Sequence, residues 1–401
     1  MTNNGLLEEV RRTRLELVRD GRWNEAERFA ADAVPGCEPA ALAYLPGSPG
    51  GGADPAVFRA VQAVHRGTGR AEAVAVVRCA LERRLDAGTF WQAVTVLLHA
   101  GEIAEAHRHW FAAGDDLLGG RIMLARGDPR AAARLLGGER ARRDVAVAWL
   151  VLALTETGEF ERAGALLETE QPDGAEVCFA RGRLLLAQGR SAAALDEFLD
   201  CGRRLTAWGV VNPAVLPWRS SAALAAADLG DLVLARICAE KDLVAARRWG
   251  AARGIGLALH AAALARGGDD VVLEEALTFL GDATADALRA RHDLAQLLLA
   301  RGEVDRARRH SRRLRETAFS PQWIEVADVL AGRLLRNAGE SALSGQERRI
   351  ALLARAGRSN REIAGELGLT LRTVECHLTA VYRKMGVAGR PGLRRAFVPT
   401  A

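Results

Sequence analysis

Residues 343–397 read LSGQERRIALLARAGRSNREIAGELGLTLRTVECHLTAVYRKMGVAGRPGLRRAF, and this stretch contains two helix-start signals of the same kind. Ser344 stands three residues before Glu347, and Ser359 stands three residues before Glu362. In such a capping box the serine oxygen accepts a hydrogen bond from an unpaired backbone N–H, and the glutamate accepts one from the serine N–H. The two signals therefore predict two successive helices.

Glycines indicate where these helices end, because glycine readily adopts the left-handed conformation that terminates a helix. The first helix is predicted to run to Gly357, and the second to span residues 360–367 and end at Gly368. Thr370 closes a three-residue turn and is the predicted N-cap of a third helix that runs through Met385. Two helices joined by a short glycine turn are typical of a helix-turn-helix.

The third helix has two distinct faces. At about 100° per residue, one narrow stripe is apolar and consists of Val374, Leu378, Val381 and Met385. Matching apolar residues on the first two helices are Ile350, Leu353, Ile363 and Leu367. The opposite face carries polar residues, namely Arg372, Glu375, Cys376, Thr379 and Arg383. A packed helix that presents arginines and small polar groups outward suits the major groove of DNA.

These residues closely resemble the LuxR-type helix-turn-helix family of bacterial transcription regulators. The family pattern has an L-[TS] start, then SN-x-EIA-x-x-L, TV-x-x-H and KLGV, which match residues 343–344, 359–364, 373–377 and 384–387 here. The resemblance implies a four-helix domain that binds double-stranded promoter DNA, with RNA polymerase as a further partner. It also implies a homodimer formed through the fourth helix. The alternative interpretation is a helical cap on the preceding region.

Geometry then assigns roles within this domain. Four outward residues of the third helix are expected to face base edges: Arg372, Glu375, Cys376 and Thr379. A second set is expected to contact or flank the DNA backbone: Asn360, Arg361, Thr373, His377, Arg383 and Lys384. For His377, at the edge of the apolar stripe, a structural role stays equally open. A thiol-sensing role is the alternative for Cys376.

Two positions depart from the family pattern. Glu375 stands where many members have a lysine that contacts DNA. Because an ionised carboxylate only accepts hydrogen bonds, it would read an amino donor, most naturally cytosine N4. The fourth helix begins with Arg390, Pro391 and Gly392. Glycine weakens a helix by about 1 kcal/mol, so dimerisation through this short helix stays open.

The charge of the chain is unevenly distributed. Residues 343–401 contain eleven arginines and lysines but four acidic residues, a net charge of +7, whereas the rest of the 401-residue chain carries −2. A small basic module of this kind predicts phosphate contacts and salt-sensitive binding.

Residues 1–340 are predicted to be helical throughout, with a Gly-x4-Ala pattern that recurs along them. Its members are Gly21/Ala26, Gly88/Ala93, Gly101/Ala106, Gly127/Ala132, Gly158/Ala163, Gly189/Ala194, Gly230/Ala235 and Gly302/Ala307. Each unit is interpreted as helix, glycine turn and helix, with the alanine at a tight crossing. This resembles the tetratricopeptide repeat and implies an all-α, tetratricopeptide-like superhelix with a concave groove for a protein or small-molecule effector. The predicted domains are therefore residues 1–340 and 341–401.

Two segments interrupt this pattern. Residues 35–55 contain PGSPGGGADP, which predicts a flexible loop. Residues 212–219 contain two prolines expected to kink or bound a helix, and Trp218 there is interpreted as a core residue. Residues 200–340 also resemble the region that precedes the DNA-binding end of the large ATP-binding LuxR-family regulators.

The chain contains two lysines, Lys241 and Lys384, and neither stands in a G-x4-G-K-[ST] phosphate-binding loop. ATP hydrolysis is therefore not expected, and the chain is interpreted as a regulator without the ATPase domain. No enzyme activity, cofactor or metal site is predicted. The six cysteines are scattered, and His107 and His109 lack acidic or cysteine partners at ligand spacing.

We therefore expect a cytoplasmic bacterial transcription regulator without a membrane span or signal peptide, in which a helical-repeat region controls a DNA-binding domain. A second hypothesis is a protein-binding scaffold whose basic tail binds nucleic acid only loosely. A third is a remnant that titrates a full-length paralogue. The sequence alone does not name the effector, the promoter or the sign of regulation.

Overall fold

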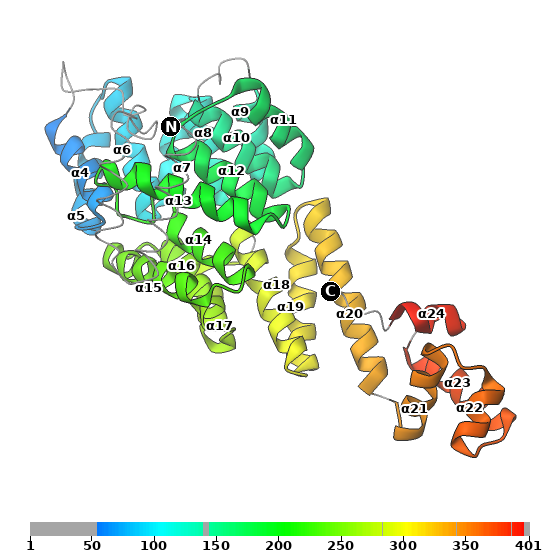
Figure 1. The fold of residues 1–401 in the computed structure, drawn as a ribbon. Helices are drawn as coiled ribbons and strands as arrows, with labels where there is room; N and C mark the ends of the chain where they lie inside the picture. Colours follow the sequence, from blue (N-terminus) through cyan, green and yellow to red (C-terminus); the bar gives the residue numbers. More distant parts are fainter. Residues whose placement is uncertain (1–53, 139–143, 283, 342, 386, 397–401) are drawn as a thin grey trace, which may run out of the picture. The chain divides into compact units, whose positions relative to one another are not determined.

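The computed structural model describes residues 54–138, 144–282, 284–341, 343–385 and 387–396, and every regular element in these ranges is an α-helix (Figure 1). The predicted all-α class is therefore confirmed. The chain forms two compact units. The first comprises the described residues up to Ala290 together with Phe319–Gln322, and the second comprises Arg291–Ala318 and the described residues from Trp323 onward.

The described part of the first unit begins with three pairs of helices: α4 (Pro55–Arg66), α5 (Arg70–Leu81), α6 (Ala87–Ala100), α7 (Ile103–Ala113), α8 (Asp116–Arg126) and α9 (Pro129–Leu136). It continues with α10 (Asp144–Thr157), α11 (Phe160–Glu170), α12 (Ala175–Ala187), α13 (Ser191–Ala207), α14 (Trp218–Asp228), α15 (Leu232–Trp249), α16 (Ala252–Ala265) and α17 (Asp270–Leu280). Helix α18 (Ala285–Ala300) passes from the first unit into the second. The second unit then contains α19 (Val304–Thr317), α20 (Pro321–Ser341) from Trp323 onward, α21 (Gly345–Arg355), α22 (Asn360–Leu367), α23 (Leu371–Met385) and α24 (Gly389–Ala396).

The Gly-x4-Ala pattern has a common structural meaning at six of its positions. The six glycines have φ between 74° and 87°, and the paired alanines are fully buried. The pairs are Gly101/Ala106, Gly127/Ala132, Gly158/Ala163, Gly189/Ala194, Gly230/Ala235 and Gly302/Ala307. In each case the next helix begins two residues after the glycine. The glycine provides the left-handed turn between paired helices, and a side chain as small as alanine fits where the second helix begins.

The Gly-x4-Ala pattern gave a wrong prediction at Gly88, which lies inside the first turn of α6 rather than in a turn between helices. The reason is a local cap. Asp86 Oδ1 accepts a hydrogen bond from the Thr89 backbone N–H at 3.0 Å, so the helix has already begun before Gly88 is reached. Gly21/Ala26 and residues 35–53 of the predicted loop lie outside the described residues.

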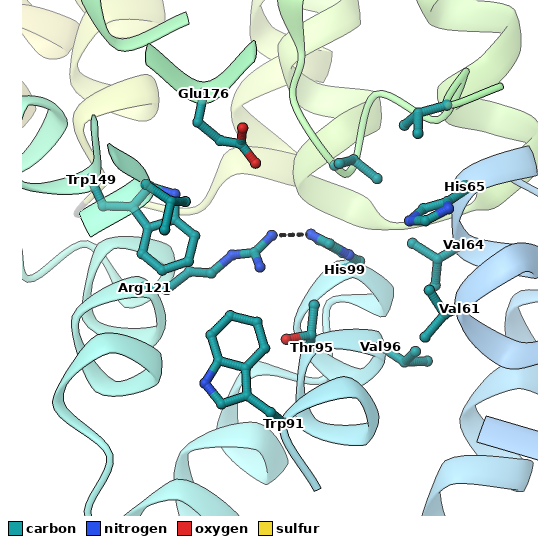
Figure 2. Close-up of a pocket in the computed structure, with 13 residues that line it drawn as sticks. Val61, Val64, His65, Trp91, Thr95, Val96, His99, Arg121, Trp149 and Glu176 are labelled. Atoms are coloured by element: carbon teal, nitrogen blue, oxygen red, sulfur yellow. Dashed lines mark hydrogen bonds between the residues drawn. The ribbon is translucent and has the colours of Figure 1, made fainter. Parts of the chain in front are cut away.

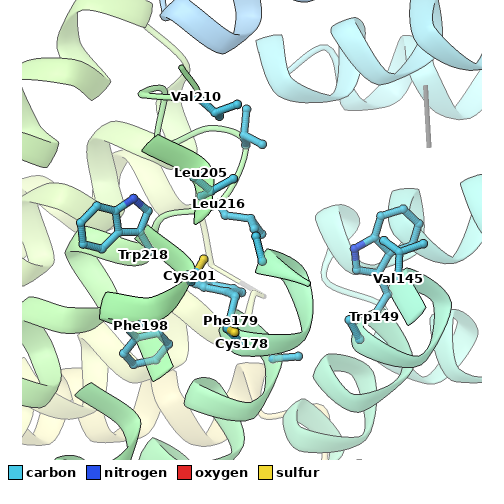
Figure 3. Packing of buried hydrophobic residues seen from close by; sticks show 14 of the residues in the cluster. Val145, Trp149, Cys178, Phe179, Phe198, Cys201, Leu205, Val210, Leu216 and Trp218 are labelled. Carbon is cyan, nitrogen blue, oxygen red and sulfur yellow. The ribbon is translucent and has the colours of Figure 1, made fainter. Parts of the chain in front are cut away.

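Close approach of helices also explains two glycines in the core of the first unit (Figure 3). A Cβ atom on Gly182 of α12 would lie 2.6 Å from Phe198 on α13, and one on Gly202 would lie 2.5 Å from Trp218. Trp218 is almost fully buried at the start of α14, directly after Pro217, its N-cap. The prediction that Trp218 is a core residue and that a proline bounds a helix is confirmed.

The first unit closes on itself. The backbone N–H groups of Val211 and Asn212, in the loop after α13, donate to the His65 carbonyl at 2.9 and 3.2 Å. The Asn212 side chain donates to the Val64 carbonyl at 2.7 Å, and the indole N–H of Trp249 donates to the His99 carbonyl at 2.8 Å. These contacts join α4 and α6 to the segment from α13 to α15. The inner side of the helical array is thereby enclosed.

Among the residues that the structure describes, no helix is long and apolar enough to cross a membrane. The same residues contain no group of three or more histidine, cysteine or acidic side chains placed to hold a metal ion.

Candidate nucleic-acid interface

The capping and glycine signals of residues 343–385 coincide with three helices, α21, α22 and α23, as the sequence predicts. Both capping boxes are present: Ser344 and Ser359 accept from the N–H groups of Glu347 and Glu362 at 3.2 and 3.3 Å. The glutamates accept in return from the serine N–H groups at 2.6 and 2.7 Å. Helix α22 ends at Gly368, which has a φ of 65°. These caps fix where α22 starts and stops, and so fix its angle to α23.

Helix α23 buries the predicted apolar stripe. Val374, Leu378, Val381 and Met385 belong to a separate core, together with residues of α21, α22 and α24. The cap of α23 is also as predicted, since the hydroxyl oxygen of Thr370 accepts from the Thr373 N–H at 3.2 Å. Because the stripe is held by this core, the opposite face of α23 is turned outward.

All four residues predicted to face DNA bases lie exposed on α23: Arg372, Glu375, Cys376 and Thr379. The Thr379 hydroxyl donates to the Glu375 carbonyl at 2.9 Å, which holds that side chain against its own helix. The structure therefore brings the four residues together on one surface. Whether they read bases stays a prediction.

Three arginines of this domain have no internal ion pair within the part of the chain that the structure describes. Arg361, Arg372 and Arg383 are exposed, and none of them has a carboxylate partner among the described residues. Some arginines of α19, by contrast, pair with nearby acids, as in Arg306–Glu303 at 2.7 Å. Arginines without an internal partner keep their charge and donors for an external anion such as phosphate.

Lys384 has a contact that the sequence interpretation missed. Its ammonium lies 2.6 and 2.9 Å from the two carboxylate oxygens of Glu347, which is only 6% exposed. The hydrogen bond from Lys384, with that from the Ser344 N–H, lowers the pKa of Glu347 to about 2. Glu347 therefore joins the cap of α21 to the end of α23. The predicted backbone contact of Lys384 would compete with this ion pair.

The other residues predicted to contact the DNA backbone are partly engaged in contacts within the domain. Asn360 accepts a hydrogen bond from the Arg390 guanidinium, which also donates to the Arg358 carbonyl and so ties α24 to the start of α22. Thr373 and His377 are half-buried at the margin of the exposed face. No local sequence pattern indicates the Arg390 contact, because its partners lie about thirty residues earlier.

The fourth helix packs into the domain. Leu393 of α24 is fully buried in the same core as the α23 stripe. A Cβ atom on Gly392 would lie 3.1 Å from the Val387 side chain, so glycine permits a close approach at this point. Gly392, which as a glycine weakens the helix, thus has a packing role.

Helices α22 and α23, joined by the turn at residues 368–370 and supported by α21 and α24, form a helix-turn-helix domain, a class of DNA-binding module. Comparison with known proteins identifies the family of this domain. The LuxR family of bacterial regulatory proteins matches residues 341–396. Residues 341–396 are therefore a LuxR-type helix-turn-helix domain, as the sequence motifs predict.

One curated protein similar to this chain is the transcriptional regulatory protein MctR of Rhizobium johnstonii. The two are 41% identical over 70 residues, a stretch that covers 18% of this chain and 32% of MctR. The chain thus matches about a third of the length of this relative. The likeness supports DNA-binding transcription regulation.

Proposed function

We propose that this protein is a sequence-specific transcription regulator whose helix α23 reads the major groove of promoter DNA. The observation that carries the proposal is the placement of Arg372, Glu375, Cys376 and Thr379. They share one exposed face of α23, opposite a buried apolar stripe, within the domain that matches the LuxR family. A helix held in this way presents several base-reading side chains at once.

Within this surface the residues would have different tasks. Arg372 would donate to guanine, and Glu375 would accept from a cytosine amino group. Arg361 and Arg383, which lack internal carboxylate partners, would contact phosphates, with Asn360, Thr373 and His377 beside them. Lys384 would serve mainly to hold α23 against α21, because Glu347 already neutralises its charge.

The helical array would supply the regulatory input. An effector bound to the first unit would alter DNA binding by the second, and the bound regulator would act on RNA polymerase, alone or as a homodimer. The enclosed inner side of the first unit supports an effector role, because it offers a surface formed by many helices at once.

The proposal is tested by selecting binding sites from random double-stranded DNA with the full-length protein. The expected result is an enriched motif. Arg372→Ala should lose discrimination at one base position, by about 1–3 kcal/mol, with other positions retained. The matched control is Arg349→Ala, which removes the same charge from an exposed position of α21. It should leave the motif unchanged. Binding of all sequences with equal affinity would instead support the scaffold hypothesis, and the proposal would fail.

A further inference from the structure

A pocket of about 140 Å³ lies at the centre of the first unit. Its described lining comes mainly from α6, α7, α8, α10, α12 and α16 and from the loop before α14. By this measure one ordered water needs roughly 10–15 Å³, so the pocket has room for a small organic molecule. A smaller pocket of about 20 Å³ shares His99, Arg121, Trp149 and Glu176 with it (Figure 2).

The walls of the larger pocket are mainly apolar. Trp149 of α10 stands on one side, and Phe179 of α12 and Leu216 lie across from it (Figure 3). Leu152 and Leu257 complete this lining. Small-molecule sites typically combine such apolar walls with a few polar groups that orient the ligand.

Arg121 is the polar group whose contacts are least complete. Its guanidinium lies over the Trp149 ring, 4.9 Å from the ring centre, and donates to Nε2 of His99. Burial lowers the pKa of His99 well below its usual value, so its imidazole is a neutral acceptor. Among the described residues, no carboxylate lies within ion-pair distance of Arg121, although Glu176 faces it across the pocket (Figure 2). Its remaining N–H donors have no carboxylate partner among the described residues.

Arg121 keeps its positive charge at neutral pH even though it is packed between Trp149 and His99. Burial lowers the pKa of its guanidinium to about 10, an effect that the charge of Glu176 partly offsets, so Arg121 remains protonated at neutral pH. The other two arginines of the pocket each have a carboxylate within ion-pair distance. Arg253 lies 2.6 Å from the buried Asp286 carboxylate, and Arg183 lies 3.4 Å from it. Arg121 is thus the arginine of this pocket that an anionic ligand would complete.

Glu156 is one of two glutamates that line the pocket, the other being Glu176. Burial, together with the nearby charge of Asp286, raises the pKa of Glu156 to about 7. Near neutral pH this carboxyl is therefore partly protonated. Its ionised form repels an anion, whereas its neutral form has an O–H that can donate a hydrogen bond.

We propose that this pocket binds a small organic carboxylate. The carboxylate accepts hydrogen bonds from Arg121, and the apolar body of the ligand lies against Trp149, Phe179 and Leu216. Arginine suits this task because its planar donors match the geometry of a carboxylate. Binding is a property of the first unit and does not depend on the proposed DNA contacts.

Isothermal titration calorimetry on the full-length protein without DNA tests this proposal. The probes are 1-naphthoate, phenylacetate and octanoate, each compared with its neutral amide. At pH 7 at least one carboxylate should bind about 10-fold or more tightly than its amide, the effect expected of a charge-assisted hydrogen bond. Arg121→Gln should remove this preference. Arg162→Gln, an exposed arginine of the same unit paired with Glu159, should keep it.

A variant expected to gain affinity separates the proposal from damage to the fold. Glu156→Gln removes the repelling charge and should bind the carboxylate more tightly than the wild type at pH 8, where Glu156 is mostly ionised. At pH 6 the two proteins should differ little. The proposal is overturned if no carboxylate binds, if amides bind equally well, or if folded Arg121→Gln retains the preference.

Discussion

The pocket of the first unit and the exposed face of the DNA-binding domain place arginines that have no ion pair among the described residues in different environments. In the DNA-binding domain, Arg361, Arg372 and Arg383 lie on the surface, on the far side of an apolar core. In the first unit, Arg121 lies inside, against Trp149, where a network around Asp286 neutralises its neighbours.

This difference determines the kind of anion that each region can bind. An exposed arginine remains hydrated, so its attraction for phosphate is weak, additive over many contacts and sensitive to salt. An arginine that is half-buried in a pocket, as Arg121 is, has lost part of its water, so it favours one small ligand that restores its hydrogen bonds. The comparison teaches that burial, rather than the number of charges, separates a polyanion surface from a small-anion pocket.

The largest expected effect tests whether the two regions have independent cores. Val374→Asp would place a carboxylate at a position that is 0% exposed, with no partner, and should destabilise the DNA-binding domain by about 3–5 kcal/mol. DNA binding should be abolished. Hydrogen exchange of peptides from residues 343–396 should rise, while that of residues 54–282 should not change.

The control for this variant is Leu371→Asp, which lies on the same helix but is 43% exposed. It adds the same charge without burying it, so exchange in the domain should stay close to that of the wild type. Increased exchange throughout the first unit in Val374→Asp would show that the two cores are energetically linked, contrary to the comparison.

The two regions also differ in how much of each could be predicted. In residues 343–385, the Ser344 and Ser359 caps, the Gly368 turn and the α23 stripe are local signals, so sequence spacing alone located them. The repeat glycines were predicted for the same reason, apart from Gly88, where the Asp86 cap prevailed.

Residues brought together from a distance could not be predicted in this way. His99, Arg121 and Glu156 stand on three different helices and meet because the first unit closes on itself. The available signal was weak: the three helices are mostly apolar and carry between one and three ionisable residues each. The Lys384–Glu347 pair was missed likewise, since its members lie on α21 and α23.

The next effect tests the repeat register of the first unit. Ala194, in the first turn of α13, is fully buried, so Ala194→Leu should overpack the crossing with α12 and cost about 1–3 kcal/mol. Thermal unfolding followed by tryptophan fluorescence measures this, because residues 343–401 contain no tryptophan. Ala192→Leu, exposed on the same turn, is the control. Equal melting temperatures for the two variants would refute the register.

A subtler effect concerns specificity on the exposed face of α23. Glu375→Lys should change the preferred base at one position of the selected site, with discrimination of about 1–3 kcal/mol there, because an acceptor is replaced by a donor. It should also strengthen non-specific binding through an added phosphate attraction. Site selection on the wild type and the variant measures both. If both proteins select the same motif, Glu375 does not face the bases.

The smallest effect compares two adjacent basic residues of α23. Arg383 is exposed and has no carboxylate partner among the described residues, whereas Lys384 is paired with Glu347. Each phosphate contact contributes roughly 0.9 to the slope of log affinity against log salt concentration. Arg383→Gln should therefore reduce this slope by about one contact and weaken all sequences alike. Lys384→Gln should leave the slope nearly unchanged and instead lower the stability of the domain.

The Lys384–Glu347 ion pair also predicts how the stability of the domain changes in acid. Since the pKa of Glu347 is lowered from its ordinary 4.5 to about 2, the pair stabilises the domain fully above pH 4.5, and this stabilisation is lost as pH falls toward 2. Lys384→Gln should therefore lose most stability relative to the wild type near neutral pH, and the difference should shrink in acid. Hydrogen exchange of residues 343–396, compared between the two proteins at matched pH, measures this. A slope reduced equally by Arg383→Gln and Lys384→Gln would mean that DNA breaks the Glu347 pair, and that Lys384 contacts phosphate after all.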